Sequence, residues 1–305
     1  MKISIAIGLI CLRVLPKKFG KKLAGVAEKV WKKIGNNAEA NVKMIRKAAL
    51  ETLNAMKPAN ELQTLRVEMQ KLSTDADYVL DLHCDIYAAL HLFTAHNDWV
   101  KGPTGPLGNE GAIQALAADL GADATMYNDP YPSTLTFSGV NSALWARLQN
   151  KFPDAAIPQA CMSVTVEMRS QHDVSDALGK SDAANLYRWL VRQGVVSGKA
   201  APLKKMKSAA APISGMDVGY SKGTGFLVFH VKPGAKVKKG QAICDVIDPA
   251  NPNGPKARIT YTSATDGVLF SRRLDGYLSW PGQVMYRIAG PKPLAHRIGM
   301  SGLDD

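Results

Sequence analysis

Apolar residues in the first quarter of the chain recur with helical spacing. Between Asn36 and Met56 they stand three or four positions apart, which predicts an amphipathic helix. Asn36 or Asn37 can cap its start, and Pro58-Ala59-Asn60 ends it. A second helix is predicted to follow, with four apolar residues on one face: Leu62, Leu65, Met69 and Leu72.

A short buried strand is predicted next, at Tyr78–Leu82, and this helix-then-strand order is typical of α/β sheets. The stretch 97–140 is rich in Gly, Pro, Asn and Asp, which predicts loops around one short helix, Glu110–Leu120. Two further helices, at 141–150 and 182–193, flank a β-branched strand at Ser163–Glu167. Long irregular segments near a strand end, such as 97–140, often line binding sites.

The composition changes near residue 198. Gly198–Pro212 consists largely of Ala, Lys, Pro and Ser, which indicates a linker. The chain has 305 residues, enough for two domains. We therefore expect a catalytic-type α/β domain at 1–197, a linker at 198–212, a β domain at 213–290 and a tail at 291–305.

The β domain contains an internal half-repeat. Strands at Gly225–Val228 and Gly267–Phe270 each lead through a Pro-Gly turn to a second strand, at Ala242-Ile243 and Val284–Ile288. This pattern resembles a barrel-sandwich of the biotinyl/lipoyl type. The turn that would carry the cofactor lysine is Ala264–Gly267, which has no lysine, so we expect a structural or substrate-gating domain. Its Asp-Gly pair suits a tight turn because both residues tolerate positive φ.

Charge and cysteine content exclude several classes of protein. The net charge is +12, concentrated between Arg13 and Lys57, and we interpret this basic arm as a solvated helix surface with no nucleic-acid partner. Met1–Leu12 is apolar but too short to span a bilayer, so we expect a strand or an aberrant start, not export and not a membrane anchor. The four cysteines are widely spaced, which favours reduced thiols and a cytoplasmic protein.

Candidate chemistry stands at the ends of two predicted strands. The apolar run from Tyr78 ends in Asp81-Leu82-His83-Cys84-Asp85, where Asp81 and His83 share one face of a strand. A histidine there can ligate a metal, and a carboxylate can orient it as an outer-shell partner. The second strand ends in Glu167-Met168-Arg169, a candidate general base and a guanidinium. Together these residues indicate metal-assisted hydrolysis, and we expect Cys84 to pack as a small apolar residue beside them.

With these two motifs and the β tail, the chain resembles the succinylglutamate desuccinylase/aspartoacylase family of zinc hydrolases. The carrying segments are Asp77–Asp85, Thr165–Arg169 and Asp266–Phe270, and the similarity runs from about Pro16 to Ala289. The resemblance implies an α/β fold: a truncated zinc-carboxypeptidase-like mixed sheet with flanking helices, followed by an all-β barrel-sandwich domain. It also implies a deacylase that cleaves the amide bond of an N-acyl amino acid.

The resemblance also implies roles for individual residues. His83 would be a ligand of Zn²⁺, and Glu167 would be the general base that moves a proton from the metal-activated water to the leaving amine. Arg13 is the nearest counterpart of the family's substrate-binding Asn-Arg. Arg169 is suited either to a substrate carboxylate or to a structural salt bridge. Many relatives associate, so a homo-oligomer is a possible assembly.

The sequence departs from the family in one respect. The first two zinc ligands of the family come from a His and a Glu upstream of the Asp-Leu-His motif, but no histidine occurs among the 82 residues before His83. We interpret the start of the chain as a truncated or frame-shifted reading. The alternative to a working hydrolase is therefore a catalytically incomplete fragment or a non-enzymatic binding protein.

Overall fold

The computed structural model describes residues 3–7, 25–30, 32–99, 109–128 and 136–298. The chain divides into two compact units, each assembled from several segments. The first unit comprises 1–82, 94–113 and 130–165, and the second comprises 83–93, 114–129 and 166–305. The boundary between the units passes through strands, so it does not follow the order of the chain.

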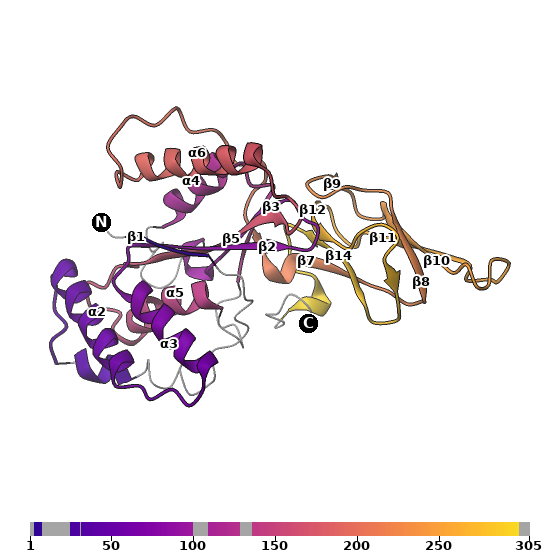
Figure 1. Cartoon of the computed structure of the whole chain (residues 1–305). Coiled ribbons are helices and arrows are strands. Elements are labelled where there is room, and N and C mark those ends of the chain that lie inside the picture. The colour runs from indigo at the N-terminus through magenta and orange to yellow at the C-terminus, as the bar shows by residue number, and fades with distance from the viewer. Residues whose placement is uncertain (1–2, 8–24, 31, 100–108, 129–135, 299–305) are drawn as a thin grey trace. The chain divides into compact units, whose positions relative to one another are not determined.

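One sheet has six strands, in the order β1-β2-β5-β3-β4-β6 (Figure 1). Their bounds are Ile3–Ile7 for β1, Tyr78–Asp85 for β2, Leu90–Thr94 for β3, Ala124–Tyr127 for β4, Met162–Ser170 for β5 and Ala211–Pro212 for β6. β1 pairs in parallel with β2, with Ile3 opposite Tyr78 and Ile7 opposite Leu82. The predicted strands near Met1–Leu12 and at Tyr78–Leu82 and Ser163–Glu167 are confirmed, and β2 and β5 each follow a helix as expected for an α/β fold.

Three helices of the first unit lie together below β1 and β2 in Figure 1. They are α2 (Ala38–Asn54), α3 (Glu61–Thr74) and α5 (Phe137–Lys151). The Asn37 side chain accepts a hydrogen bond from the Ala40 amide and caps α2, as predicted. Apolar side chains of α2 and α5, with Val79 of β2, form one core, so burial of these faces holds the first unit together.

Helix α3 forms where predicted but buries a different face. Its buried residues are Val67, Gln70 and Ser73, whereas Leu62, Leu65 and Leu72 are exposed. A polar network fixes this orientation: the Gln70 amide and the Ser73 hydroxyl both donate to the side-chain oxygen of Asn141 on α5. Buried polar groups need partners of this kind, and the apolar spacing alone does not reveal them.

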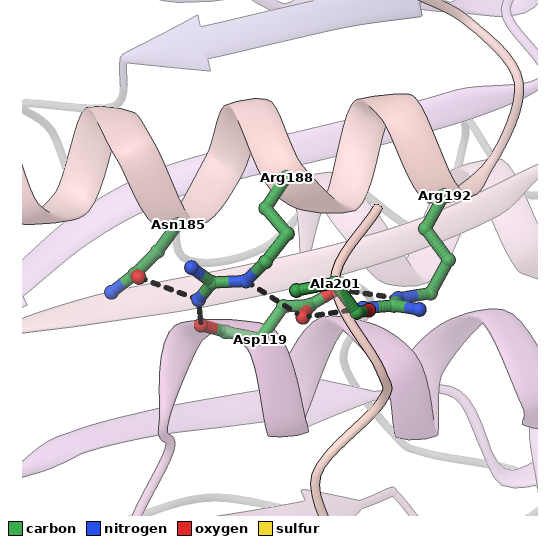
Figure 2. Close-up of polar contacts among 5 residues, drawn as sticks. All are labelled: Asp119, Asn185, Arg188, Arg192 and Ala201. Atoms are coloured by element: carbon green, nitrogen blue, oxygen red, sulfur yellow. Dashed lines mark hydrogen bonds and ion pairs between the residues drawn. The ribbon is translucent and has the colours of Figure 1, made fainter. Parts of the chain in front are cut away.

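The second unit contains α6 (Asp176–Arg192) and most of α4 (Glu110–Leu120). Figure 2 shows how they are joined: Asp119 of α4 receives hydrogen bonds from Arg188 and Arg192 of α6. Burial would raise the pKa of Asp119, but the two guanidinium groups outweigh it and lower the pKa below its usual value. Arg192 also donates to the Ala201 carbonyl at 2.8 Å, which fixes the segment after α6.

Two four-stranded antiparallel sheets occupy the C-terminal part of the second unit. Their orders are β7-β14-β12-β9 and β11-β10-β8-β13. The bounds are Met216–Tyr220 for β7, Gly225–Phe229 for β8, Lys236–Val237 for β9, Ala242–Ile247 for β10, Arg258–Thr262 for β11, Gly267–Arg272 for β12, Leu278–Ser279 for β13 and Val284–Ala289 for β14. Short 3₁₀ turns lie at His96–Asp98, Ile213–Gly215 and Ala295–Arg297, and residues 25–30 are also helical. The four strands of the predicted half-repeat are β8, β10, β12 and β14.

Gly267 is needed for a reason other than the one predicted. The sequence suggests a positive φ in an Asp-Gly turn, but Gly267 is the first residue of β12 and does not have a positive φ. A Cβ at this position would lie 2.3 Å from the Ala289 carbonyl oxygen on the neighbouring strand β14. The glycine therefore permits close approach of two backbones.

Within the described residues, no helix combines the length and the apolar character needed to cross a membrane.

Candidate functional site

The candidate site stands at the ends of two neighbouring strands. The Asp77 carbonyl accepts a hydrogen bond from the Met162 amide at 2.9 Å, and the Asp85 carbonyl accepts one from the Gln171 amide at 2.7 Å. β2 and β5 therefore run in the same direction, and both motifs end at the same edge of the sheet. Between the two bonds β5 accommodates one more residue than β2, which marks a bulge.

Arg169 lies within this bulged stretch, two residues beyond Glu167. Its φ is 86°, a value that a side-chain-bearing residue rarely adopts. The Arg169 guanidinium makes two hydrogen bonds with the Asp182 carboxylate of α6, and both side chains are mostly buried. The structure thus places Arg169 in a salt bridge, one of the two roles predicted for it. The other role, contact with a substrate carboxylate, stays a prediction.

His83 and Glu167 lie at the carboxyl ends of β2 and β5, in the same compact unit, and both are half-buried. Asp81 is buried earlier in β2, so its expected role as an outer-shell partner stays a prediction. Arg13 lies outside the described residues, so its expected contact with substrate also stays a prediction. His83 and Glu167 thus stand on neighbouring strands near the same edge of the sheet, and their roles as ligand and base stay predictions.

Cys84 is exposed, so the expectation that it packs as a small apolar residue is wrong. The burial pattern of β2 explains this, because the strand is buried from Val79 to Asp81 and becomes more exposed toward its carboxyl end, where Cys84 stands. Partial burial raises the pKa of the Cys84 thiol, and the negative charges of Glu167 and Asp85 raise it further. The negative charges of these two carboxylates therefore disfavour the thiolate form of Cys84.

Asp85 is a site residue to which the sequence assigned no role. Its carboxylate accepts a hydrogen bond from the Ser271 hydroxyl of β12 at 2.5 Å and lies 4.0 Å from the Arg287 guanidinium of β14. A second carboxylate oxygen accepts from the Ile86 amide at 2.6 Å. The C-terminal sheet thus holds the residue that directly follows His83 and Cys84.

The backbone after Asp85 is also fixed to β12. The Ala89 amide donates to the Phe270 carbonyl, and the Arg272 amide donates to the Tyr87 carbonyl, each at 2.9 Å. The Arg272 guanidinium lies 4.6 Å from the centre of the Tyr87 ring and 4.3 Å from that of Phe229. These distances are within the range of a cation–π contact, so segment 85–89 is attached to the C-terminal sheets by backbone and side chains.

The other histidines near the motifs do not add to the site. His91 is fully buried on β3, donates through Nδ1 to the Ala89 carbonyl at 2.8 Å and packs against the rings of Phe93 and Phe270. Burial lowers the pKa of His91 to about 4, so the ring is neutral at pH 7. His172 is exposed in the turn after β5. Within the described ranges, no group of three or more His, Cys, Asp and Glu side chains is arranged to hold a metal ion.

Comparison with known proteins identifies the fold. No protein-family model matches the chain, and no curated protein matches it. Solved structures do match. One is a succinylglutamate desuccinylase/aspartoacylase from Shewanella frigidimarina NCIMB 400, at a TM-score of 0.71 and 16% identity, with 90% of this chain and 70% of that chain covered.

Two further structures give the same result. A succinylglutamate desuccinylase/aspartoacylase family protein from Shewanella amazonensis SB2B matches at a TM-score of 0.70 and 15% identity, over 88% of this chain and 69% of that chain. The ectoine utilization protein EutE (DoeB) from Ruegeria pomeroyi matches at 0.54 and 15% identity, over 95% and 86%. The chain therefore has an α/β fold of the class found in desuccinylase/aspartoacylase structures, as the resemblance predicts.

Proposed function

We propose that this protein is a deacylase, a hydrolase that cleaves the amide bond of an N-acyl amino acid. The observation that carries the proposal is the placement of His83 and Glu167 at the ends of the adjacent parallel strands β2 and β5. The fold supports it, because the similar solved structures carry the names desuccinylase and aspartoacylase. The free thiols of Cys84, Cys161 and Cys244 fit the cytoplasmic location that we propose with it.

Glu167 is the residue to which we assign proton transfer. Its carboxylate would accept a proton from the attacking water as oxygen bonds to the acyl carbon, and would return that proton to the amine as the C–N bond breaks. The products are a free carboxylate and a free amino acid. Glu167 is half-buried near the carboxyl end of β5, and its negative charge acts on the Cys84 thiol of the neighbouring strand β2.

The described residues supply at most part of the zinc site that the resemblance implies. A catalytic zinc site normally has three protein ligands, and within the part of the chain that the structure describes no such group is found. We therefore assign no step to the metal, and propose only that His83 is one ligand of a zinc ion.

Metal analysis tests the zinc proposal. We would measure zinc per chain after dialysis against a weak chelator, in the wild type and in His83→Ala. About one zinc per chain that disappears in the variant supports His83 as a ligand. A wild type that retains no zinc, or a variant that retains as much, contradicts it.

The second candidate function is a binding protein without catalysis. The absence of a three-residue metal group among the described side chains favours it. The two functions differ in one observable: a binding protein retains an N-acyl amino acid unchanged, whereas a hydrolase releases free amine. Calorimetry together with an amine-detection assay on N-succinyl and N-acetyl amino acids separates them.

A further inference from the structure

A cavity of about 290 Å³ lies within the second unit. Its walls come from β4, β9, β12, the end of β14 and the segment 208–211, and none of its lining residues is a candidate catalytic residue. This volume is close to the lower limit for sites that hold small molecules. The cavity is therefore large enough for one small ligand, at residues other than those of the candidate catalytic site.

Most of the cavity wall is aliphatic. Ala124, Val268 and Ala289 are buried and belong to the hydrophobic core that joins β4 to the sheet of β12 and β14. Val237 of β9 and Pro291 extend this apolar wall. Among the described lining residues no side chain is aromatic, so the wall suits a slim aliphatic chain and offers no ring on which a planar base could stack.

The charged lining groups leave one positive charge unpaired. The Lys238 ammonium lies 3.6 Å from the Asp266 carboxylate, which also accepts a hydrogen bond from the Lys239 amide at 2.8 Å. The Lys236 ammonium forms no ion pair and no hydrogen bond with any residue that the structure describes. Two lysines and one aspartate line the cavity, so its lining has one positive charge more than it has negative charges.

Thr125 of β4 supplies a second polar group to the lining. It is only 2% exposed, and its hydroxyl forms no hydrogen bond within the described part of the chain. Buried hydroxyl groups normally have a hydrogen-bond partner, and one that is left without a partner costs free energy. An oxygen atom of a ligand in the cavity would supply this partner.

We propose that the cavity binds a free aliphatic monocarboxylate. The carboxylate accepts hydrogen bonds from the Lys236 ammonium and the Thr125 hydroxyl, and the aliphatic chain lies on the wall of Ala124, Val268 and Ala289. One carboxylate balances the one unpaired positive charge, whereas a phosphate group or a nucleotide would bring more negative charge than the lining offsets. The site is independent of the deacylase proposal, because it shares no residue with the ends of β2 and β5.

Equilibrium dialysis with radiolabelled octanoate tests the proposal. We expect the wild type to bind one octanoate per chain with a Kd below about 1 mM. Acetate carries the same charge without the long chain, and it should bind at least ~10-fold more weakly because it buries less apolar surface. No bound octanoate at concentrations up to about 10 mM, or equal affinity for acetate and octanoate, would overturn the proposal.

Three substitutions test where the octanoate is bound. Lys236→Gln removes the unpaired charge, Thr125→Val removes the hydroxyl with little change of shape, and Ala209→Trp fills part of the cavity from an exposed lining position. We expect octanoate to bind roughly 10-fold more weakly to Lys236→Gln and about 3-fold more weakly to Thr125→Val, and not to bind to Ala209→Trp.

Lys239→Gln is the matched control, because Lys239 is exposed and does not line the cavity, so this variant should bind octanoate like the wild type. Thermal unfolding shows which variants are folded. Unchanged binding by any folded one of the three variants, or an equal loss in Lys239→Gln, would overturn the proposal.

Discussion

At the scale of single residues, Asp98 shows how burial sets protonation. Asp98 is almost fully buried, with the Ala95 amide at 3.2 Å and the Asn109 amide at 3.4 Å as hydrogen-bond donors. Burial outweighs both bonds and raises the pKa of Asp98 to about 7. The native protein therefore keeps a proton on this carboxyl at pH values where the unfolded chain has lost it.

This shift predicts a pH dependence of stability. Since the native state binds the proton more tightly, the contribution of Asp98 is fully present below pH ~4 and declines as the pH rises to ~7. Asp98→Asn keeps the shape without the charge, so the variant should exceed the wild type in unfolding free energy at pH 8, on the order of a few kcal/mol. Urea unfolding at pH 4.5 and at pH 8 measures this, and equal stability of the two proteins at pH 8 would refute it.

Some of the site residues can be predicted from the sequence and others cannot. His83 and Glu167 each stand near the end of a strand that the apolar pattern predicts, so local pattern places them in the fold, while their roles stay predictions. The role of Asp85 depends on Ser271, which lies 186 positions later, and no local pattern links the two. For Cys84 the residue type led to a wrong prediction: cysteine is usually buried, but this one is exposed near the end of β2.

At the scale of elements, the spacing of apolar residues predicts where helices form better than which face they bury. Helix α2 behaves as predicted from its spacing and cap, whereas α3 turns Gln70 and Ser73 inward. Gln70 and Ser73 find a buried partner, Asn141, which the sequence places in another helix. The spacing of apolar residues predicts only which apolar side chains are buried. It does not predict a polar contact between two helices, even where that contact sets the orientation of a helix.

The junction of α4 and α6 gives a second prediction. Asp119 is 5% exposed and forms ion pairs with both Arg188 and Arg192, as Figure 2 shows. Asp119→Asn removes the charge that both guanidinium groups contact, and should lower the unfolding free energy by about 2 kcal/mol at pH 7. The difference should fade as the pH falls below ~4, because the pKa of Asp119 is lowered and protonation removes the same charge.

Urea unfolding of Asp119→Asn beside Asp154→Asn provides the measurement and its control. Asp154 is exposed, so its substitution should change stability by less than about 0.5 kcal/mol. Equal effects of the two substitutions would show that the Asp119 contacts do not stabilise the junction.

The segment after the candidate site gives a third prediction. Ser271→Ala removes the hydroxyl that donates to Asp85, a charge-assisted bond, and should loosen the attachment of segment 85–89 to β12. We expect the Ala89 amide, which is bonded to the Phe270 carbonyl, to exchange its hydrogen roughly 10-fold faster.

Hydrogen exchange followed by mass spectrometry measures this effect. Ser279→Ala is the control, because Ser279 is fully buried in β13 and its hydroxyl has no hydrogen-bond partner among the described residues. Faster exchange in both variants would indicate general loosening of the C-terminal sheets. Unchanged exchange in Ser271→Ala would show that the hydroxyl does not hold the segment.

At the scale of the whole molecule, the order of helices and strands predicts the α/β class. The same order does not predict which segments of the chain form each compact unit. The second unit joins the ends of β2 and β5 to everything after residue 166. Contacts such as that of Ala89 with Phe270 create this grouping. These contacts connect segments far apart in sequence, so composition carries no information about them, and the predicted boundary near residue 198 stays a prediction.

This grouping predicts the outcome of truncation. A chain that ends at residue 205 keeps His83 and Glu167 but loses Ser271, Arg272 and the sheet to which segment 85–89 is attached. It also exposes apolar surface of the second unit to water. We expect residues 1–205 to aggregate or to lose most deacylase activity, as light scattering and amine release would show. Full activity of a monomeric 1–205 fragment would contradict this.

We propose that the ends of β2 and β5 form a deacylase site in which Glu167 moves the proton. Amine release from a panel of N-succinyl and N-acetyl amino acids, by the wild type and by Glu167→Gln, tests this proposal, with thermal unfolding recorded for both. We predict release by the wild type from at least one substrate, and a loss of at least ~100-fold in Glu167→Gln without loss of folding. No release from any substrate, or equal release by a folded Glu167→Gln, would contradict the claim.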